Sequence, residues 1–103
     1  MTFRSKALLE TARGQLCTMR GPTCNYDPAT TVWAHSRRLS HGKGIGKKAN
    51  DCFGAHLCSA CHDLYDGRTK ANEYSRAYVD ALFERARDAT LLRLFEQGSL
   101  KVL

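Results

Sequence analysis

The chain lacks every sequence feature that would place it in a membrane or send it across one. No apolar run approaches the roughly 20 residues that a membrane-spanning helix needs. The first ten residues, MTFRSKALLE, lack the continuous apolar core of a secretory signal. The 5 cysteines are an odd number, and without a secretory signal they do not indicate a disulfide framework. These absences predict a cytoplasmic, intracellular protein with reduced thiols and no membrane partner.

Acidic residues are also absent between positions 35 and 50, although the chain as a whole carries 10 of them. Basic residues in the same stretch are Arg37, Arg38, Lys43, Lys47 and Lys48. With a net charge of +6, this focused positive charge favours a polyanionic partner, and nucleic acid above others. The alternative is a basic surface that is only solvated.

Glycines alternate with other residues in this basic stretch, at positions 42, 44 and 46. The composition resembles that of a phosphate-binding loop, but the Walker spacing that ends in Lys-Ser or Lys-Thr is missing, which argues against an ATP site. We expect a mobile loop over 40–48 that meets the DNA backbone.

Four cysteines fall into two pairs, Cys17 with Cys24 and Cys58 with Cys61. Two such pairs in one small chain are typical of a structural zinc site with four sulfur ligands, and Cys52 is then the spare. Reduced, buried cysteines without a metal are the alternative. Because structural zinc contributes about 10–16 kcal/mol of apparent binding energy, the ion would matter greatly to a domain of this size.

The chain shows no internal repeat and no second domain, so residues 1–103 are predicted to form one domain of the α+β class. Expected elements are a helix over 4–13, strands over 30–35 and 52–57, a helix over 59–66 stopped by Gly67, and a helical segment within 69–103. In that segment Asn72 is the expected N-terminal cap, Gly98 follows the end, and a bend near Ala89-Thr90 is left open. The apolar spacing there predicts a buried face formed by Tyr74, Tyr78, Ala81, Leu82, Ala86, Ala89, Leu92 and Phe95.

His62 and Asp66 lie four residues apart and therefore on one face of the 59–66 helix. An imidazole and a carboxylate so placed form half of a site for Mg²⁺, Mn²⁺ or a similar divalent cation. His35 ends the first predicted strand beside Arg37 and Arg38. Histidine exchanges protons near neutral pH, and guanidinium groups bind phosphate oxygens, so His35 is a candidate general base at a phosphate site. An ordinary surface or buried histidine is the alternative for His35, and core or surface packing is expected for His56.

A strand that ends in Ala34-His35, followed by a second strand and by the sequence LCSACH over residues 57–62, resembles the HNH, or ββα-metal, endonucleases. The resemblance covers about residues 15–68, and the whole chain is similar to the small phage and prophage nucleases of the YbcO type. It implies a zinc-stabilised ββα-metal unit, flanked by an N-terminal helix and a C-terminal helical segment. It also implies His35 as general base, His62 and Asp66 as ligands of a catalytic cation, and the four cysteines as the zinc site.

Two positions depart from the family pattern. Many relatives have Asp or His before the general base, where this chain has Ala34, and strict spacing places the middle Asn of the family name near Phe53. Asn50 or Asp51 could take that role only if the second strand is longer than expected. Asp51, His41, water or the substrate phosphate could complete the site. His41 lies in the Gly-Lys loop, where a contact with solvent or phosphate is expected ahead of a role as ligand.

The leading hypothesis is a metal-dependent DNA endonuclease. Substitution of His35 tests this hypothesis, because it should abolish cleavage. The rivals are a non-catalytic, zinc-dependent DNA-binding module and a protein-interaction module of a phage recombination or replication complex.

Overall fold

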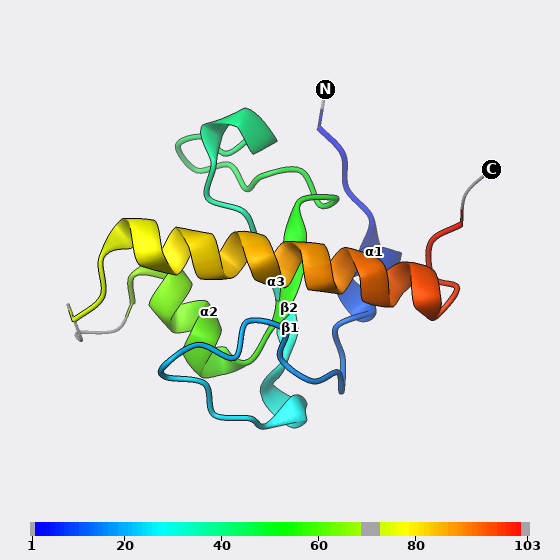
Figure 1. Ribbon diagram of the computed structural model, residues 1–103. Helices are drawn as coiled ribbons and strands as arrows, with labels where there is room; N and C mark the ends of the chain where they lie inside the picture. The colour runs from blue at the N-terminus through cyan, green and yellow to red at the C-terminus, as the bar shows by residue number, and fades with distance from the viewer. Residues whose placement is uncertain (1, 69–72, 102–103) are drawn as a thin grey trace.

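The computed structural model describes residues 2–68 and 73–101, and two short strands stand at its centre. The elements in chain order are α1 (Lys6–Glu10), η1 (Pro28–Thr30), β1 (Val32–His35), η2 (Leu39–His41), β2 (Gly54–Leu57), α2 (Ser59–Asp66) and α3 (Arg76–Glu96). The long α3 crosses the two strands and covers one face of the molecule (Figure 1). This is the α+β arrangement that the sequence predicts. Among the described residues, no helix has both the length and the apolar character that a bilayer requires.

The sheet consists of β1 and β2, which pair antiparallel with Val32 opposite Leu57 and His35 opposite Gly54. Both strands are shorter than predicted, because the 3-10 helix η1 precedes β1 and a turn precedes β2. Gly54 has a steric role in the pairing, since an added Cβ would stand 2.3 Å from Nε1 of Trp33. The indole can therefore lie across the strand end only because position 54 has no side chain.

Helix α2 has the bounds that the sequence predicts, Ser59–Asp66. At its start Cys58 is the N-cap, and its Sγ accepts a hydrogen bond from the amide of Cys61. At its end Gly67 adopts a φ of +74°, the left-handed conformation that glycine takes without strain. The N-terminal α1 is shorter than the predicted 4–13 helix and is capped by Ser5.

Helix α3 is one continuous helix, with no break near Ala89-Thr90. Ser75 is its N-cap through a hydrogen bond from the amide of Tyr78, so the expectation of a cap at Asn72 is not met; Asn72 itself lies outside the described residues. Gly98 follows the end with a φ of +76°, as predicted.

The predicted buried face of α3 is wrong for five of its eight positions. Tyr78, Ala81, Ala89, Leu92 and Phe95 are exposed, while Leu82 and Ala86 are buried as expected. The face that packs inward comprises Val79, Leu82, Phe83, Ala86, Thr90 and Leu94. Apolar residues occur on several sides of this helix, so spacing alone allowed two stripes. The position of β2 and α2 beneath the helix selects the stripe that begins at Val79.

The main core lies between α3, the sheet and α2 and includes the cysteine pairs. The ring of Tyr65 in α2 stacks on Phe83 of α3, with 3.9 Å between ring centroids. The Tyr65 hydroxyl also accepts a hydrogen bond from the amide of Arg37 at 2.7 Å. Tyr65 therefore joins α2 to both α3 and the end of β1. A second, smaller core forms around Trp33, Ala12 and Leu94.

His56 is fully buried on β2, where it packs edge-on against Trp33. Arg93 approaches Nδ1 of His56 at 3.0 Å, and since arginine can only donate, Nδ1 accepts. Nε2 then carries the proton and donates to the Thr11 hydroxyl at 3.1 Å. Of the core and surface packing expected for His56, the structure shows the core, with partners that no local pattern reveals.

The free energy of unfolding should fall as the pH drops from about 6.5 to about 4. Burial, and then the charge of Arg93, lower the pKa of His56 to about 4. The unfolded chain therefore binds more protons than the folded chain between these values, and protonation favours unfolding. A shift of this size corresponds to at most about 3 kcal/mol. Urea unfolding at several pH values measures the slope. If His56→Gln, which cannot titrate, shows the same slope, His56 is not its source.

Candidate functional site

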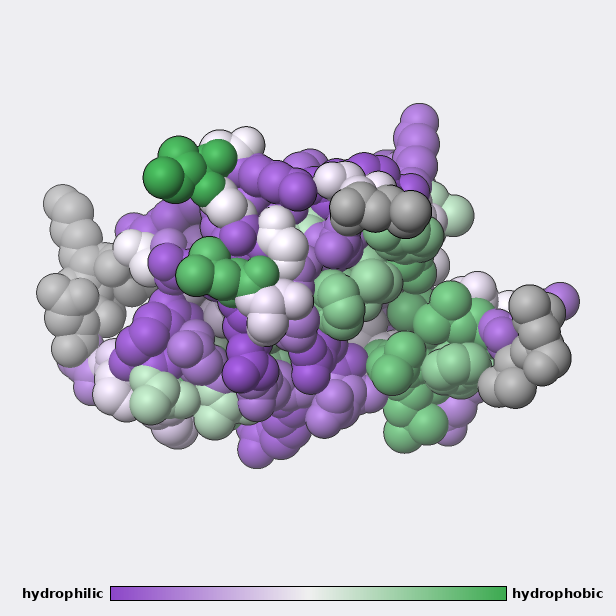
Figure 2. Space-filling view, turned by 90° about the horizontal axis from the view of Figure 1, so that it is seen from above, coloured by the Kyte–Doolittle hydropathy of each residue, from purple (hydrophilic) through white to green (hydrophobic). Residues whose placement is uncertain are grey.

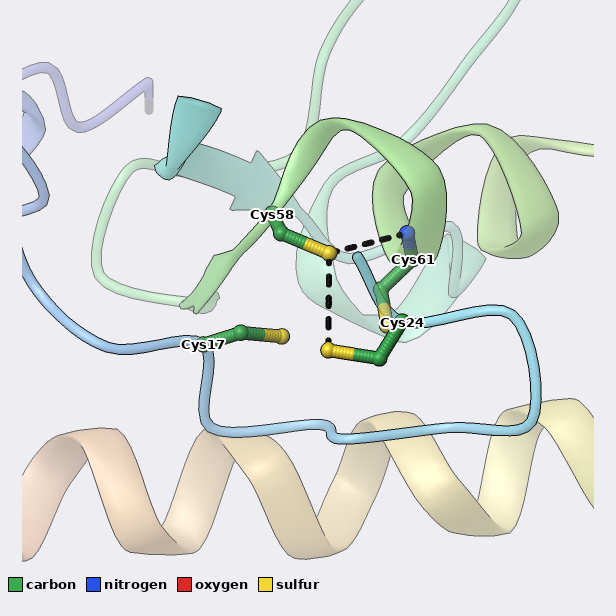
Figure 3. A group of neighbouring side chains, drawn as sticks. All are labelled: Cys17, Cys24, Cys58 and Cys61. Atoms are coloured by element: carbon green, nitrogen blue, oxygen red, sulfur yellow. Dashed lines mark hydrogen bonds between the residues drawn. The ribbon is translucent and has the colours of Figure 1, made fainter. Parts of the chain in front are cut away.

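The sulfurs of Cys17, Cys24, Cys58 and Cys61 point toward one common centre (Figure 3). All four lie within 4.8 Å of one another. Cys58 and Cys61 come from the start of α2, while Cys17 and Cys24 come from the loop that follows α1. The cluster thus connects an irregular segment of the chain to the first turn of a helix.

The spacing of the sulfurs fits a tetrahedral zinc ion. A zinc–sulfur distance of about 2.3 Å places two ligand sulfurs roughly 3.8 Å apart in a regular tetrahedron. The Sγ atoms of Cys58 and Cys24 lie 3.7 Å apart. Within the described residues, these cysteines form the one group of three or more His, Cys, Asp or Glu side chains close enough to share an ion. They could therefore hold a metal ion such as zinc.

The electrostatics of the cluster also suit a cation. A hydrogen bond from Cys61, partly opposed by burial, lowers the pKa of Cys17 to about 4. The same bond and burial raise the pKa of Cys61, and burial raises the pKa of Cys24 to about 11. A divalent cation would replace the thiol protons of the cluster. Cys52 is exposed and outside the cluster, as predicted for the spare cysteine.

A cleft of about 420 Å³ opens where the end of β1 faces α2. Its walls combine two histidines, one carboxylate and four cationic side chains. The lining residues are Trp33, His35, Ser36, Arg37, Lys43, Lys48, His62, Asp66 and Arg68. The structure therefore brings His35, His62 and Asp66 to one cavity, although the two histidines lie 27 positions apart in the chain.

Asp51 contacts the imidazole of His35, with its Oδ1 atom 2.7 Å from Nε2 of the ring. Asp51 is nearly fully buried, in the turn before β2. A longer second strand was expected to be needed for Asp51 to take part in the site, yet β2 starts later, at Gly54, and Asp51 reaches His35 from the turn before it.

The N-terminal segment fixes Asp51 in turn. The amide of Ser5 donates to Oδ2 of Asp51 at 2.6 Å, and Arg4 reaches Oδ1 at 3.3 Å. Arg4 also donates to the carbonyls of Ala49 and Lys48. Burial by itself would raise the pKa of Asp51, but the bonds from His35 and Ser5 and the charge of Arg4 outweigh it, so the pKa lies below its ordinary value. The buried group is therefore a carboxylate at neutral pH.

His62 and Asp66 face the cleft from successive turns of α2. Nε2 of His62 lies 2.9 Å from Oδ2 of Asp66, as the four-residue spacing predicts. Arg68 approaches the same carboxylate oxygen at 3.1 Å. Burial opposes ionisation of Asp66, but His62, Arg68 and Arg37 together hold its pKa below the ordinary value.

The predicted phosphate-binding residues separate into two groups. Arg37, Lys43 and Lys48 line the cleft, whereas Arg38 forms an ion pair with Glu84 of α3 beside it. Lys47 is exposed on the loop and does not line the cleft.

His41 is not a solvent-facing contact, and the structure corrects that expectation. Its ring stacks on Phe53 with 4.1 Å between centroids, and its nitrogens meet the Ser36 hydroxyl and Arg87. It lies outside the cleft lining, so it does not complete the site around His35.

Sequence reasoning missed Arg4, Ser5 and Arg68 as parts of this site. For Arg68 a signal was present, because it follows Asp66 by two residues just beyond the helix end. No local signal connects Arg4 or Ser5 with Asp51, since 46 positions separate Ser5 from that carboxylate.

These features define a small α+β protein that pairs a cluster of four cysteines, which could hold a metal ion, with a basic cleft. Residues 6–98 match the family model described as "Putative nuclease YbcO". Two relatives are 46% identical to this chain over 95 residues, which cover 91% of it and 96% of each relative. They are "Putative nuclease YbcO" of Escherichia coli strain K12 and its counterpart of the same description from Enterobacteria phage 82.

A solved structure also matches the fold, with a TM-score of 0.71 at 30% sequence identity. The match covers 87% of this chain and 98% of the other chain. The matched structure is described as that of a putative bacteriophage protein from Escherichia coli K-12 MG1655. The chain belongs to the YbcO family of putative nucleases.

Proposed function

We propose that this chain is a metal-dependent endonuclease of the HNH type that hydrolyses phosphodiester bonds in DNA and is encoded by a phage or prophage. The observation that carries the proposal is the cleft in which His35 faces the same cavity as His62 and Asp66, among four cationic side chains. The order of two antiparallel strands followed by α2 supports the ββα-metal assignment. Two relatives described as putative nucleases, one of them from a phage, point the same way.

In this proposal His35 is the general base. Because the buried Asp51 carboxylate can only accept a hydrogen bond, the Nε2 atom of His35 carries the proton that joins them. The other ring nitrogen, Nδ1, is then unprotonated and can remove a proton from an attacking water. Asp51 thus takes the orienting role that the middle Asn has in the family, and it also stabilises the imidazolium that forms.

His62 and Asp66 are the residues that would hold a divalent cation, such as Mg²⁺ or Mn²⁺. Their donor atoms, an imidazole nitrogen and a carboxylate oxygen, are adjacent and face the cleft, which fits such an ion. When bound, the cation supplies positive charge to the phosphate and to the leaving oxygen. Ala34 is fully buried and offers no further ligand, so water and the phosphate itself would fill the other positions.

Arg37, Lys43, Lys48 and Arg68 would hold the DNA backbone across the cleft. Arginine forks and lysine ammonium groups bind phosphate oxygens and position the strand without reading bases. Arg68 has a second role here, because its contact with Asp66 neutralises that carboxylate when no cation does.

His35→Ala should abolish nicking of supercoiled plasmid in the presence of Mg²⁺, Mn²⁺ or Ni²⁺. Loss of a general base typically costs about 10²-fold to 10⁴-fold in rate. The two proteins are purified in parallel, and gel electrophoresis of the plasmid over time gives the rates. Equal nicking by both would trace the activity to a contaminant and reject the assignment of His35.

One observation favours a second candidate function, a non-catalytic DNA-binding module. Within the part of the chain that the structure describes, only His62 and Asp66 are placed to hold the catalytic cation, and Arg68 already pairs with Asp66. DNA binding that weakens steeply with salt, while no divalent cation supports cleavage, would establish the binding module instead.

A further inference from the structure

The 36–53 connection between the two strands projects away from α3 as a loop with a narrow base (Figure 1). At the base, the amide of Asn50 donates to the carbonyl of His41 at 2.9 Å. The Asn50 side chain closes on Gly42, where an added Cβ would stand 2.9 Å from Nδ2. The loop is therefore pinned at its base, and residues 43–48 stand beyond that base.

The end of this loop is a tight turn rather than an irregular coil. Gly44 and Lys47 exchange two backbone hydrogen bonds, each 3.1 Å long. Gly46 has a φ of +67°, which a type II turn requires at its third residue. The turn thus leaves Ile45 at its outermost corner, where its side chain is fully exposed, with a relative exposure of 108%.

A large apolar side chain at such a corner contributes no burial to the free energy of folding, because it stays exposed to water. Figure 2 looks onto the side from which the loop projects. On the left part of this face two separate hydrophobic groups stand among hydrophilic residues, apart from a larger hydrophobic patch on the right. The large hydrophobic side chains that this loop exposes are Ile45 and Leu39, which is 79% exposed. Both stand among cationic residues of a stretch that contains no acid.

The turn also stands beside the cleft. Lys43 precedes it and Lys48 follows it, and both line the cavity that contains His35. A phosphate backbone held in the cleft would therefore bring the rest of the duplex against the turn. The positive charge around Ile45 is complementary to a nucleic acid.

We propose that Ile45 is an apolar wedge that enters the minor groove of double-stranded DNA lying over the cleft and partly unstacks one base step. This inference rests on the proposed function in one respect, namely that the substrate is DNA. Proteins that bind the minor groove use apolar side chains flanked by Lys and Arg in this way, and they bend the duplex as they do so. We expect Ile45 to insert at pyrimidine–purine steps, because these base steps unstack most readily.

The test compares Ile45→Ser with the conservative Ile45→Leu and with Lys47→Ala. Each protein is titrated, without added divalent cation, into a duplex with 2-aminopurine at a central TA step. The unaltered protein and Ile45→Leu should raise the 2-aminopurine fluorescence, and Ile45→Ser should not. Ile45→Ser should bind about tenfold more weakly with an unchanged dependence on salt, whereas Lys47→Ala should reduce the salt slope by about one. Since position 45 is fully exposed, folding should be unaffected, as circular dichroism can verify.

Two results would overturn the wedge. One is equal affinity and equal fluorescence for Ile45→Ser and the unaltered protein, and the other is an unaltered protein that binds no duplex at low salt. Plasmid or single-strand cleavage in either case would leave the nuclease proposal intact. Conversely, the expected fluorescence pattern with no cleavage under any metal would reject the hydrolase and keep the wedge.

Discussion

A strong chelator should unfold the chain by removing the metal ion that the four cysteines are expected to hold. Circular dichroism at 222 nm should lose most of its helical signal, and the cooperative thermal transition should disappear after treatment with a strong chelator at neutral pH. Structural zinc contributes about 10–16 kcal/mol of apparent binding energy, and a whole domain is stable by only about 5–15 kcal/mol. The free energy of metal binding is therefore comparable to the whole free energy of unfolding of such a domain.

The structure shows which segment of the chain would detach if the metal were removed. Residues 15–27 form neither helix nor strand, yet they bring Cys17 and Met19 into the main core. Four sulfurs packed within 4.8 Å of one another link this segment to the start of α2. Without an ion, the thiols must bind protons, and the segment loses its attachment.

Cysteine variants provide the matched control. Cys58→Ser should lower the metal content measured by mass spectrometry from one ion per chain to near zero, and the protein should unfold. Cys52→Ser makes the same chemical change at the exposed spare cysteine and should keep both the metal and the melting temperature. A metal-free protein that retains its spectrum and its melting temperature would disprove the structural role of the ion.

Asp51→Asn should reduce the rate of DNA cleavage by about 10²-fold to 10⁴-fold while leaving substrate affinity nearly unchanged. An amide at position 51 can present its NH₂ group to His35, and the imidazole would then carry its proton on Nδ1, the nitrogen needed as the base. The change leaves the size of the side chain unaltered, so the loss should appear in kcat rather than in KM. Steady-state cleavage of a fluorescent duplex separates the two constants.

The ¹⁵N chemical shifts of the His35 ring report the same effect without any catalysis. They should show the proton on Nε2 in the unaltered protein and a shifted tautomer in Asp51→Asn. Asp88→Asn is the control, because it removes the same charge at an exposed position of α3 outside the cleft. Arg4→Gln should cost less, about tenfold, since the Ser5 amide and His35 still hold the carboxylate. Unchanged cleavage by Asp51→Asn would show that His35 needs no orienting partner.

Predictions based on short-range spacing agreed best with the structure. The 59–66 helix, its glycine stop, the adjacent His62 and Asp66, and the grouping of the four cysteines were all predicted from residues close together or from paired motifs. In each case the covalent geometry of a helix or turn leaves few alternatives.

Predictions that depended on packing were less successful. The inward face of α3 was misassigned because both of its apolar stripes satisfy helical spacing, and only the helix and sheet beneath it decide between them. His41 was expected in solvent but stacks on Phe53, a contact that the fold of the 36–53 loop creates.

The sequence by itself determined the family, the zinc-type cysteine set and the pair on α2, since each is encoded by residue types at fixed local intervals. Only the tertiary structure decided that Asp51 supports His35 and that Arg4 and Ser5 secure Asp51. Those contacts join residues 16 to 47 positions apart, and their cost in chain entropy is offset only when the sheet and the N-terminal segment have already packed together.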